Sequence, residues 1–589
     1  MKKIAECLSE KLSEAFQAAG YDPAYGAVRV SDRPDLCEFQ CNGAMAAAKA
    51  YKKAPFVIAE AVLSECGKAE KLPFEAEAVR PGFINLKVTD EFLRDYVREA
   101  AADDKLAIPQ EENPKTIVLD YGGPNVAKPL HVGHLRSAVI GESIKRICRE
   151  TGNKVLGDVH LGDWGLQMGL IITELRHRKP ELPYFDENAS VFPTEAPFTI
   201  SELEEIYPTA SAKSKEDDEY RQEALAATAE LQAGRAGYHA LWEQIIAVSV
   251  ADLKRNYARL DVHFDLWKSE SDAQPYIPTM VEKLKADGFA RYDDGALVID
   301  VGEPTDKKEI PPCIVLKSDG ASLYSTTDMA TILEREKLFD PDEIIYVVDK
   351  RQAMHFTQVF RSVRKAGIVS RDTELVHVGF GTMNGKDGKP FKTRDGGVMR
   401  LENLLNDIEA EMQVKIEDNK NVREEDAGDT ARMVALAALK YGDLSNQASK
   451  DYVFDVDKFT SFEGNTGPYI LYTIVRIKSI LGKASAEDLE KAVPSAIGTP
   501  SGSEEKTLML DLADFGSAVW ETYQELAPHR LCAYIYKTAN DFNRFYHDTK
   551  ILSEEDDEKR VSYLALLQAV RKALEKSIEL LGFTAPEHM

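Results

Sequence analysis

The residues most able to do chemistry are His131, Gly133 and His134, with Lys128 just upstream. Two histidines three residues apart on the first turn of a helix project toward the same side. Imidazole and ammonium groups can hydrogen-bond the oxygens of a triphosphate while charge develops in a phosphoryl or adenylyl transfer. Gly133 would let a flat ring approach the backbone. The alternative is that both histidines serve only as local helix caps. The repeated histidine and the nearby lysine favour a nucleotide site.

The segments around these histidines form a strand, a helix and a second strand. Residues 116–120 are short, apolar and β-branched, which is typical of a buried strand. A Gly/Pro loop at 122–124 leads into a helix from about residue 133 to 151, and residues 155–161 form the next strand. This order predicts a parallel sheet, with the histidine loop at the carboxyl end of the first strand, where ligands bind. We expect the helix N-terminus to offer free N–H groups to phosphate.

The remaining segments indicate a multidomain protein, as 589 residues require. Further strands are predicted at 313–316, 343–348 and 375–380, and a long, charged, largely helical insertion spans about 174–256. Residues 1–110 mix helical and strand patterns. From residue 429 to the end the pattern is almost entirely helical.

His131–His134 resembles the His-Ile-Gly-His motif of class I aminoacyl-tRNA synthetases, and residues 124–137 resemble the arginyl branch of that family. Four further segments resemble the same branch, namely 162–169, 324–328, 351–356 and 464–469.

This resemblance covers nearly the whole chain and implies three domains. They are an α+β N-terminal domain (1–110) that touches the tRNA elbow, an α/β parallel-sheet, Rossmann-like catalytic domain (111–428) with the helical insertion, and an all-α anticodon-binding domain (429–589). The implied activity links arginine to the 3′ end of tRNA with ATP and Mg²⁺, and the family usually needs tRNA before it activates arginine.

The second motif of this class is a lysine-rich loop that closes on pyrophosphate. Here the candidate is residues 388–397, in which Lys389 and Lys392 have the family spacing but Pro390 and Phe391 replace Met and Ser. The resemblance implies that Lys128 takes over part of the role of this degenerate loop. The alternative for Lys389 and Lys392 is a solvated surface turn.

A pocket selective for arginine needs carboxylates, because the planar guanidinium forms strong, directional pairs with them. By the resemblance, Asp120 and Asp328 hold the guanidinium and Tyr324 packs beside it. Asn125 and Gln352 hold the α-amino and carboxylate groups. The alternative for each of these residues is a cap or a turn.

Two helices of the C-terminal region are candidates for holding tRNA. In the helix that starts at Pro528, three basic residues seven apart lie along one outer face and would contact phosphates: Arg530, Lys537 and Arg544. In the helix that Pro468 opens, one face carries residues suited to stacking on unpaired bases: Tyr469, Tyr472 and Arg476. The alternative is core tyrosines and merely solvated charges. The resemblance places Tyr546 and Met589 near the anticodon loop, and Asn85 near the tRNA elbow.

Composition indicates which partners, metal sites and cellular location to expect. The net charge of −26 alone argues against a nucleic-acid partner, but screening makes the local distribution of charge decisive. Only Cys37 and Cys41 lie close together among the seven cysteines, so we expect reduced thiols and no structural zinc. No apolar run approaches the ~18 residues of a membrane span, and acidic and basic residues interrupt any signal peptide. We expect a cytoplasmic monomer whose partners are tRNA, L-arginine and ATP.

Two other functions remain open from the sequence. A small-molecule nucleotidyltransferase shares the histidine motif but lacks the helical C-terminal domain. A non-catalytic, RNA-binding paralogue would keep the fold without the reaction.

Overall fold

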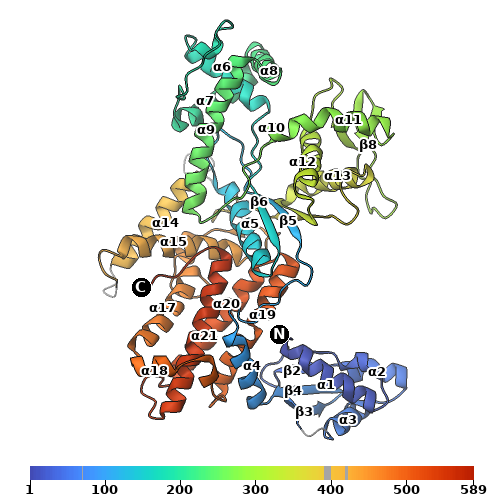
Figure 1. The fold of residues 1–589 in the computed structure, drawn as a ribbon, viewed down its shortest axis with the longest axis vertical. Helices are drawn as coiled ribbons and strands as arrows, with labels where there is room; N and C mark the ends of the chain where they lie inside the picture. Colours follow the sequence, from blue (N-terminus) through green and yellow to red (C-terminus); the bar gives the residue numbers. More distant parts are fainter. Residues whose placement is uncertain (69–70, 390–398, 418–421) are drawn as a thin grey trace.

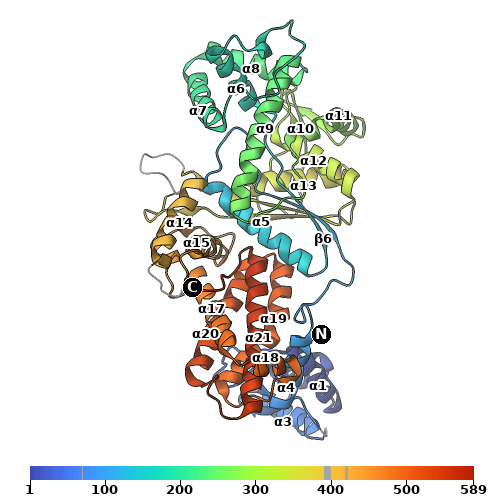
Figure 2. The same ribbon diagram turned by 60° about the vertical axis from the view of Figure 1, so that its left-hand side comes forward.

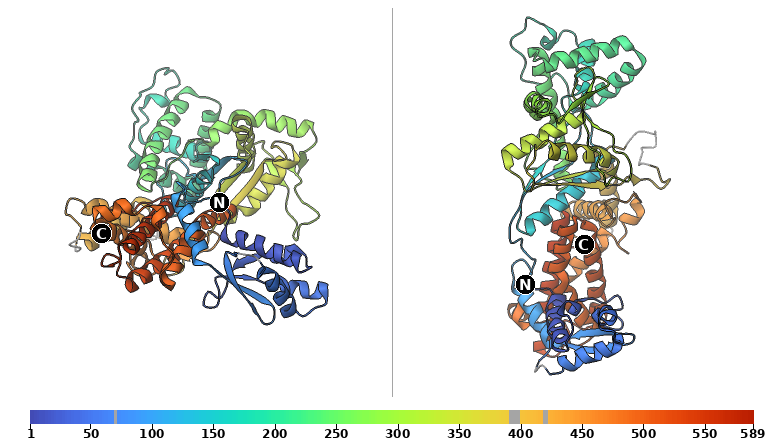
Figure 3. Two further views of the ribbon diagram at one scale, coloured as in Figure 1. Left: turned by 60° about the horizontal axis from the view of Figure 1, so that its bottom comes forward. Right: turned by 90° about the vertical axis from the view of Figure 1, so that its right-hand side faces the viewer.

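The computed structural model describes residues 1–68, 71–389, 399–417 and 422–589. The molecule is elongated (Figure 1). The N-terminal domain and a helical bundle lie at one end, the parallel sheet lies in the middle, and the helical insertion forms the other end (Figure 3).

The N-terminal domain is an antiparallel sheet covered by helices. Its strand order is β1-β2-β4-β3. In β4, alternation buries Ile84, Leu86 and Val88, while Asn85 faces away from the core. The elements are α1 (Ile4–Ala18), η1 (Pro23–Gly26), β1 (Val28–Val30), β2 (Phe39–Cys41), α2 (Gly43–Tyr51), α3 (Pro55–Cys66), β3 (Phe74–Val79), β4 (Phe83–Val88) and α4 (Asp90–Ala102).

The central sheet is parallel throughout, with the order β11-β10-β5-β6. Its strands are β5 (Thr116–Tyr121), β6 (Lys154–Asp158), β10 (Glu343–Asp349) and β11 (Glu374–Phe380), and its main helices are α5 (Val132–Glu150), α12 (Tyr324–Phe339) and α13 (Ala353–Lys365). Alternate residues bury opposite faces: Ile117 and Leu119 lie in the core that contains α5, and Val118 lies in the core that contains α12 and α13. After β5 the chain continues to β6, which pairs with one edge of β5, and β10 pairs with its other edge. This arrangement opens a crevice at the carboxyl end of β5.

Two differences from the predicted strands have local causes. Residues 313–316 form a strand as expected, but it belongs to a separate antiparallel sheet of β7 (Arg291–Asp293), β8 (Ala296–Ile299) and β9 (Cys313–Leu316). The strand expected over 155–161 ends at Asp158. Beyond it the backbone instead bonds the 266–268 segment, and His160 has a φ of +37°.

Helices form the insertion and the C-terminal region. The insertion consists of α6 (Leu166–Arg178), η2 (Pro183–Phe185), α7 (Ile200–Glu216), α8 (Asp218–Gln232) and α9 (Ala236–Arg259). It returns to the sheet through α10 (Glu270–Ala273), η3 (Gln274–Tyr276) and α11 (Ile277–Ala286), and η4 (Lys350–Gln352) precedes α13.

The C-terminal helices are α14 (Leu401–Glu417), α15 (Ala427–Leu444), α16 (Val456–Phe459), α17 (Gly467–Lys483), α18 (Ala486–Lys491), α19 (Ser503–Glu525), α20 (Pro528–Asp548) and α21 (Asp557–Leu581), with η5 at Pro494–Ala496. One short strand, β13 (Tyr452–Val453), interrupts this helical region and pairs with β12 (Met383–Asn384).

Helix α5 connects the sheet to the bundle. It packs on the sheet and also contacts α15, α19, α20 and α21, and Figure 2 shows it above the ends of the bundle helices. At its buried side, Arg136 donates to Asp443 at 2.9 Å and to the Gly381 and Lys450 carbonyls. None of the helices that the structure describes combines the length and the apolar run that crossing a bilayer requires.

Candidate active site and tRNA-facing surface

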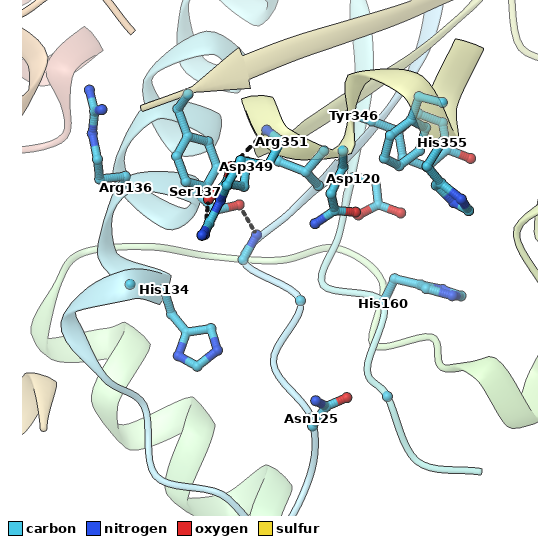
Figure 4. Close-up of a pocket in the computed structure, with 18 of the residues that line it drawn as sticks. Asp120, Asn125, His134, Arg136, Ser137, His160, Tyr346, Asp349, Arg351 and His355 are labelled. Carbon is cyan, nitrogen blue, oxygen red and sulfur yellow. Dashed lines mark hydrogen bonds and ion pairs between the residues drawn. The ribbon is translucent and has the colours of Figure 1, made fainter. Parts of the chain in front are cut away.

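A cavity of about 880 Å³ opens at the carboxyl ends of β5 and β10. Eight of the residues predicted from sequence line it: Asp120, Asn125, His131, Gly133, His134, Tyr324, Asp328 and Gln352. Figure 4 shows Asp120, Tyr346 and His355 together on one side of this cavity and His134 on the other. The fold therefore brings the two histidines predicted to bind phosphate and the predicted arginine-binding groups to a single cavity.

The two histidines of the first motif form a compact pair. Their ring centroids are 3.8 Å apart. Nδ1 of His131 accepts the Gly133 N–H at 3.0 Å, and Nδ1 of His134 accepts the His131 N–H at 3.2 Å. Both rings thus cap α5 and line the cavity at once, so the capping role does not exclude contact with a ligand in the cavity. Because each Nδ1 is an acceptor, each neutral ring carries its proton on Nε2.

The electrostatic environment keeps both imidazoles neutral. Burial, with the neighbouring His131 and Lys128 contributing, lowers the pKa of His134 to about 3. Burial also lowers the pKa of His131, again with Lys128 contributing. At neutral pH the pair offers hydrogen-bond donors rather than positive charge.

The expectation of free N–H groups at the start of α5 is wrong. The Val132 N–H donates to the Met399 carbonyl at 3.1 Å, and the N–H groups of Gly133 and His134 both donate to His131. The histidine cap and the 399–401 segment satisfy these donors. Binding of phosphate at this turn therefore depends on side chains.

Two of the lysines predicted to bind phosphate, Lys128 and Lys389, lie outside the cavity lining. Nζ of Lys128 is 4.4 Å from the ring centroid of Tyr207 in α7. Lys389 is exposed in a turn, where its N–H donates to Asp387 at 3.0 Å. Lys392 lies outside the described residues. The segment that follows the second motif is bonded to the residue that precedes the histidine motif, because the Leu401 N–H donates to the Leu130 carbonyl at 2.8 Å.

On the acidic side of the cavity, Asp328 is held by a histidine. Nε2 of His355 lies 2.5 Å from Oδ2 of Asp328. Tyr324, one helical turn before Asp328, is 70% exposed at the cavity mouth. Asp328 and Tyr324 are thus free to meet a ligand on one face of α12, as their i, i+4 spacing predicts.

Asp120 has a partner within the chain. Nη2 of the buried Arg335 donates to Oδ2 of Asp120 at 2.6 Å and to Oδ2 of Asp158 at 2.7 Å. Burial raises the pKa of Asp120, and Arg335 opposes this rise. Asp120, Asp158 and His160 have ligand atoms within 4.8 Å of one another, a spacing that suits a metal ion. The guanidinium of Arg335 already bonds both carboxylates, so a second cation between them would be repelled.

Sequence reasoning missed two titratable residues that line the cavity, Glu270 and His160. Burial, with the nearby carboxylates of Asp163 and Asp328 contributing, raises the pKa of Glu270 to about 7, and His160 opposes this rise. His160 lies in an irregular segment and Glu270 begins the one-turn helix α10, and the two segments bond through the Glu270 N–H and the Leu161 carbonyl, at 3.0 Å. No periodicity marks such segments.

The sequence offered a signal for two further residues. His355 and Arg351 lie in the 351–356 segment that resembles the family, although only Gln352 was assigned a role there. Arg351 pairs with Asp349 through Nε at 2.9 Å and Nη2 at 2.6 Å, and all three of Asp349, Arg351 and His355 line the cavity.

A second cavity, of about 1240 Å³, lies between α17, α20 and the segment after α20. The guanidinium of Arg476 lies 4.7 Å from the Tyr472 ring centroid and 5.5 Å from that of Tyr546. Tyr472 and Tyr546 are 39% and 41% exposed. Five basic or imidazole side chains line this cavity: Arg476, Lys483, Arg544, His547 and Lys550. Exposed aromatic rings beside positive charge suit unpaired nucleotides.

The other residues predicted to bind tRNA have different surroundings. Tyr469 is half-buried, and its hydroxyl bonds Asn540 and Asn543. The predicted basic track is largely neutralised, because Arg530 pairs with Glu525, Lys537 pairs with Asp511 and Asp541, and Arg544 pairs with Asp541.

Asn85 and Met589 lie outside both cavities. Oδ1 of Asn85 accepts from Gln40 at 3.0 Å on the face of β4 opposite the core. Met589 is buried, at 5% exposure, at the end of a tail that Lys478 of α17 holds through the Ala585 and Pro586 carbonyls.

Comparison with protein families gives a consistent result along the chain. Residues 96–456 match the model for tRNA synthetases class I (R), catalytic domain. The chain belongs to the arginyl-tRNA synthetase family. Residues 2–88 match the arginyl tRNA synthetase N terminal domain, and residues 470–589 match the DALR anticodon binding domain.

Individual arginyl-tRNA synthetases are similar over their full length. The arginine–tRNA ligase of Agathobacter rectalis is 61% identical and that of Alkaliphilus oremlandii is 55% identical, each over 100% of both chains. The crystal structure of the Plasmodium falciparum arginyl-tRNA synthetase has the same fold, with a TM-score of 0.83 at 24% identity over 100% of both chains. The Thermus thermophilus enzyme gives a TM-score of 0.76 at 23% identity, again over 100% of both chains.

Proposed function

We propose that this chain activates L-arginine with ATP to arginyl-adenylate and transfers the arginyl group to the 3′ adenosine of its tRNA. Pyrophosphate leaves in the first step and AMP in the second. The observation that carries this proposal is that one cavity holds the paired His131 and His134 and the carboxylates Asp120 and Asp328. One group of residues suits a polyphosphate, and the other suits a forked cation.

In the first step, a carboxylate oxygen of arginine attacks the α-phosphorus of ATP, and the bond to the β-phosphate oxygen breaks. The Nε2–H groups of His131 and His134 donate to phosphate oxygens as their negative charge grows. Because both rings are neutral and fixed by backbone bonds, they need no reorganisation during the step. In the second step, the 2′- or 3′-hydroxyl of the terminal adenosine attacks the arginyl carbonyl, and AMP leaves.

Arginine would lie between the two acidic groups. Asp328 and Asp120 pair with the guanidinium, Tyr324 packs beside it, and Asn125 and Gln352 hold the α-amino and carboxylate groups. Because unpaired carboxylates would face an uncharged analogue such as citrulline, binding alone would discriminate strongly. Catalysis comes mainly from this positioning.

Three lysines are assigned to the phosphates. Lys128 is the nearest described candidate, since its charge reaches both histidines. Turning away from Tyr207 would bring its ammonium toward the cavity. Lys389 and Lys392 would approach pyrophosphate from the second motif.

Mg²⁺ would enter with ATP rather than reside in the protein. Of the carboxylates that line the cavity, Asp120, Asp328 and Asp349 already pair with Arg335, His355 and Arg351. The ion would therefore take its ligands mainly from phosphate oxygens and water. When bound, it neutralises charge on pyrophosphate.

The tRNA would contact the N-terminal domain and the C-terminal helical bundle. Residues 1–110 would meet the elbow near Asn85. The second cavity would take anticodon bases against Tyr472 and Tyr546, with Arg476 between them and phosphates near Arg544. Tyr469, Arg530, Lys537 and Met589 would support this surface from its edges.

We further propose that the enzyme is a cytoplasmic monomer without structural zinc. The seven thiols are free, and six of them are buried, which suits a reducing compartment.

The test is exchange of labelled pyrophosphate into ATP. We expect exchange that depends on arginine and on tRNA together. A small-molecule nucleotidyltransferase would exchange with a different substrate and without tRNA. A non-catalytic paralogue would bind tRNA without exchange, and either result would overturn the proposal.

A further inference from the structure

Arg335 is a fully buried arginine behind the proposed arginine site. It lies in α12, is 2% exposed, and does not line the cavity. Its Nη2 atom bonds two carboxylates at once, Asp120 at 2.6 Å and Asp158 at 2.7 Å. The guanidinium also lies 5.3 Å from the ring centroid of Tyr346. An arginine side chain of the protein is thus held directly behind the site proposed for an arginine substrate, against Asp120.

The sheet places these two carboxylates side by side. Asp120 and Asp158 are register partners across the parallel pair of β5 and β6. Asp158 is fixed from behind, because its Oδ1 accepts the N–H groups of His160 at 3.3 Å and Lys268 at 3.2 Å. Of the three charged groups, only Asp120 lines the cavity.

The charges of this cluster do not cancel. Two carboxylates and one guanidinium leave a net charge of −1, and the group that faces the cavity is Asp120. Within the described part of the chain, only Oδ2 of Asp120 accepts a side-chain hydrogen bond, so Oδ1 remains for a ligand. Two buried carboxylates this close could not both stay ionised without a counterion.

We propose that Arg335 and Asp158 are positioning residues that set the arginine site to one net negative charge and present Asp120, ionised, to a single cation. This inference rests on the proposed function. Without Arg335, Asp120 and Asp158 share one proton, so the net charge stays at −1 but is divided between the two carboxylates, and Asp120 is no longer held fully ionised toward the substrate. Without Asp158, Arg335 neutralises Asp120 completely. Each single loss weakens arginine binding, and the two losses together leave Asp120 as the one ionised group.

The experiment compares KM for arginine and for ATP in tRNA-dependent pyrophosphate exchange. The variants are Arg335→Gln, Asp158→Asn, the double variant and Arg335→Lys. Asp158→Asn keeps an Oδ1 acceptor for its two backbone partners. The control is Arg361→Gln in α13, because Arg361 is a partly buried arginine that also bonds an aspartate, Asp306, but lies outside the cavity.

We expect each of Arg335→Gln and Asp158→Asn to raise KM for arginine about tenfold or more, with KM for ATP nearly unchanged. The double variant should have a lower KM for arginine than either single variant. Arg335→Lys should stay within about threefold of wild type, because a single nitrogen makes both contacts. Arg361→Gln should leave both KM values unchanged.

A purely structural role for Arg335 predicts additive damage, so a double variant worse than both single variants overturns the inference. An unchanged KM for arginine in Asp158→Asn overturns it as well, and this variant decides the matter if Arg335→Gln does not fold. Failure of the proposed function would look different, since wild type itself would then show no exchange dependent on arginine.

Discussion

Nε2 of His355 lies 2.5 Å from Oδ2 of Asp328, and this contact joins the N-terminal parts of α12 and α13 at the edge of the cavity. The histidine fixes the direction of the carboxylate, and the second oxygen remains for a ligand. Asp328 is therefore the described carboxylate best placed to select arginine.

Asp328→Ala should raise KM for arginine about 10- to 100-fold, the range expected for loss of a charge-assisted hydrogen bond. KM for ATP should change little, because the histidine pair lies elsewhere in the cavity. Pyrophosphate exchange measures both constants. Asp319→Ala is the matched control, since Asp319 lies in the turn before α12 and outside the cavity. Equal increases in both constants would contradict the assignment of Asp328.

The low pKa of His134 predicts a loss of stability in acid. Its folded pKa is about 3, against 6.5 ordinarily, so below pH 6.5 the unfolded chain binds more protons than the folded one. The contribution of His134 is thus complete above pH 6.5 and is lost as pH falls toward 3, by up to about 1 kcal/mol per pH unit.

His134→Asn should retain an acceptor for the His131 N–H and remove this titration. Between pH 7.5 and 5.5, the Tm of wild type should fall further than that of the variant. The exposed His588 offers a control, because His588→Asn should follow wild type. Parallel falls in Tm for wild type and His134→Asn would count against a buried, neutral His134.

Gly133 is required by the histidine beside it. A Cβ at this position would lie 2.7 Å from Cε1 and 2.8 Å from Nδ1 of His131. Gly133→Ala should displace that ring and lower kcat for adenylate formation at least tenfold, because misplacement of about 1 Å can cost about 100-fold in rate. Alanine is a better helix former than glycine, so Tm should not fall comparably.

Gly428→Ala is the matched substitution for Gly133→Ala. Gly428 also lies in the first turn of a helix, α15, and its nearest neighbour is the Arg432 side chain at 4.0 Å. It should leave kcat unchanged. If Gly133→Ala keeps full activity in pyrophosphate exchange, the position of the His131 ring is not critical.

The sequence predicted the part of the site that depends on local pattern. The strand at 116–120, the helix that follows and the histidine spacing are read within about twenty residues, so His131, His134 and Asp120 could be placed in one cavity. Glu270 and His160 could not, because a one-turn helix and an irregular segment show no periodicity, and only the returning chain brings the two together. The partner of Asp120 could not be predicted either, because Arg335 lies 215 residues further along the chain.

The prediction of a basic track on α20 did not include the acidic partners of its three residues. Spacing by seven places Arg530, Lys537 and Arg544 on one face, but it says nothing about Asp511, which α19 supplies. The cavity beside α17 shows instead that Arg544 and Arg476 share one concave surface. Tertiary packing, rather than helical periodicity, determines which of these charges meet a ligand.

Arg476 is the residue on which this concave surface depends. Its guanidinium lies against Tyr472 and Tyr546, and its Nη1 donates to Asn543 at 2.6 Å. Arg476→Ala should raise KM for tRNA in aminoacylation about tenfold, by removing a charge and loosening both rings. KM for arginine and ATP should not change.

Arg476→Lys separates charge from stacking, because an ammonium cannot lie flat between two rings. We expect its KM for tRNA to lie between those of wild type and Arg476→Ala. Only Arg476→Ala, which removes the charge, should make KM for tRNA depend less on salt concentration than in wild type. Lys491→Ala removes an exposed lysine of α18 that pairs with Glu487 outside the cavity, and it should behave as wild type. An unchanged KM for tRNA in Arg476→Ala would place the anticodon on another surface of the bundle.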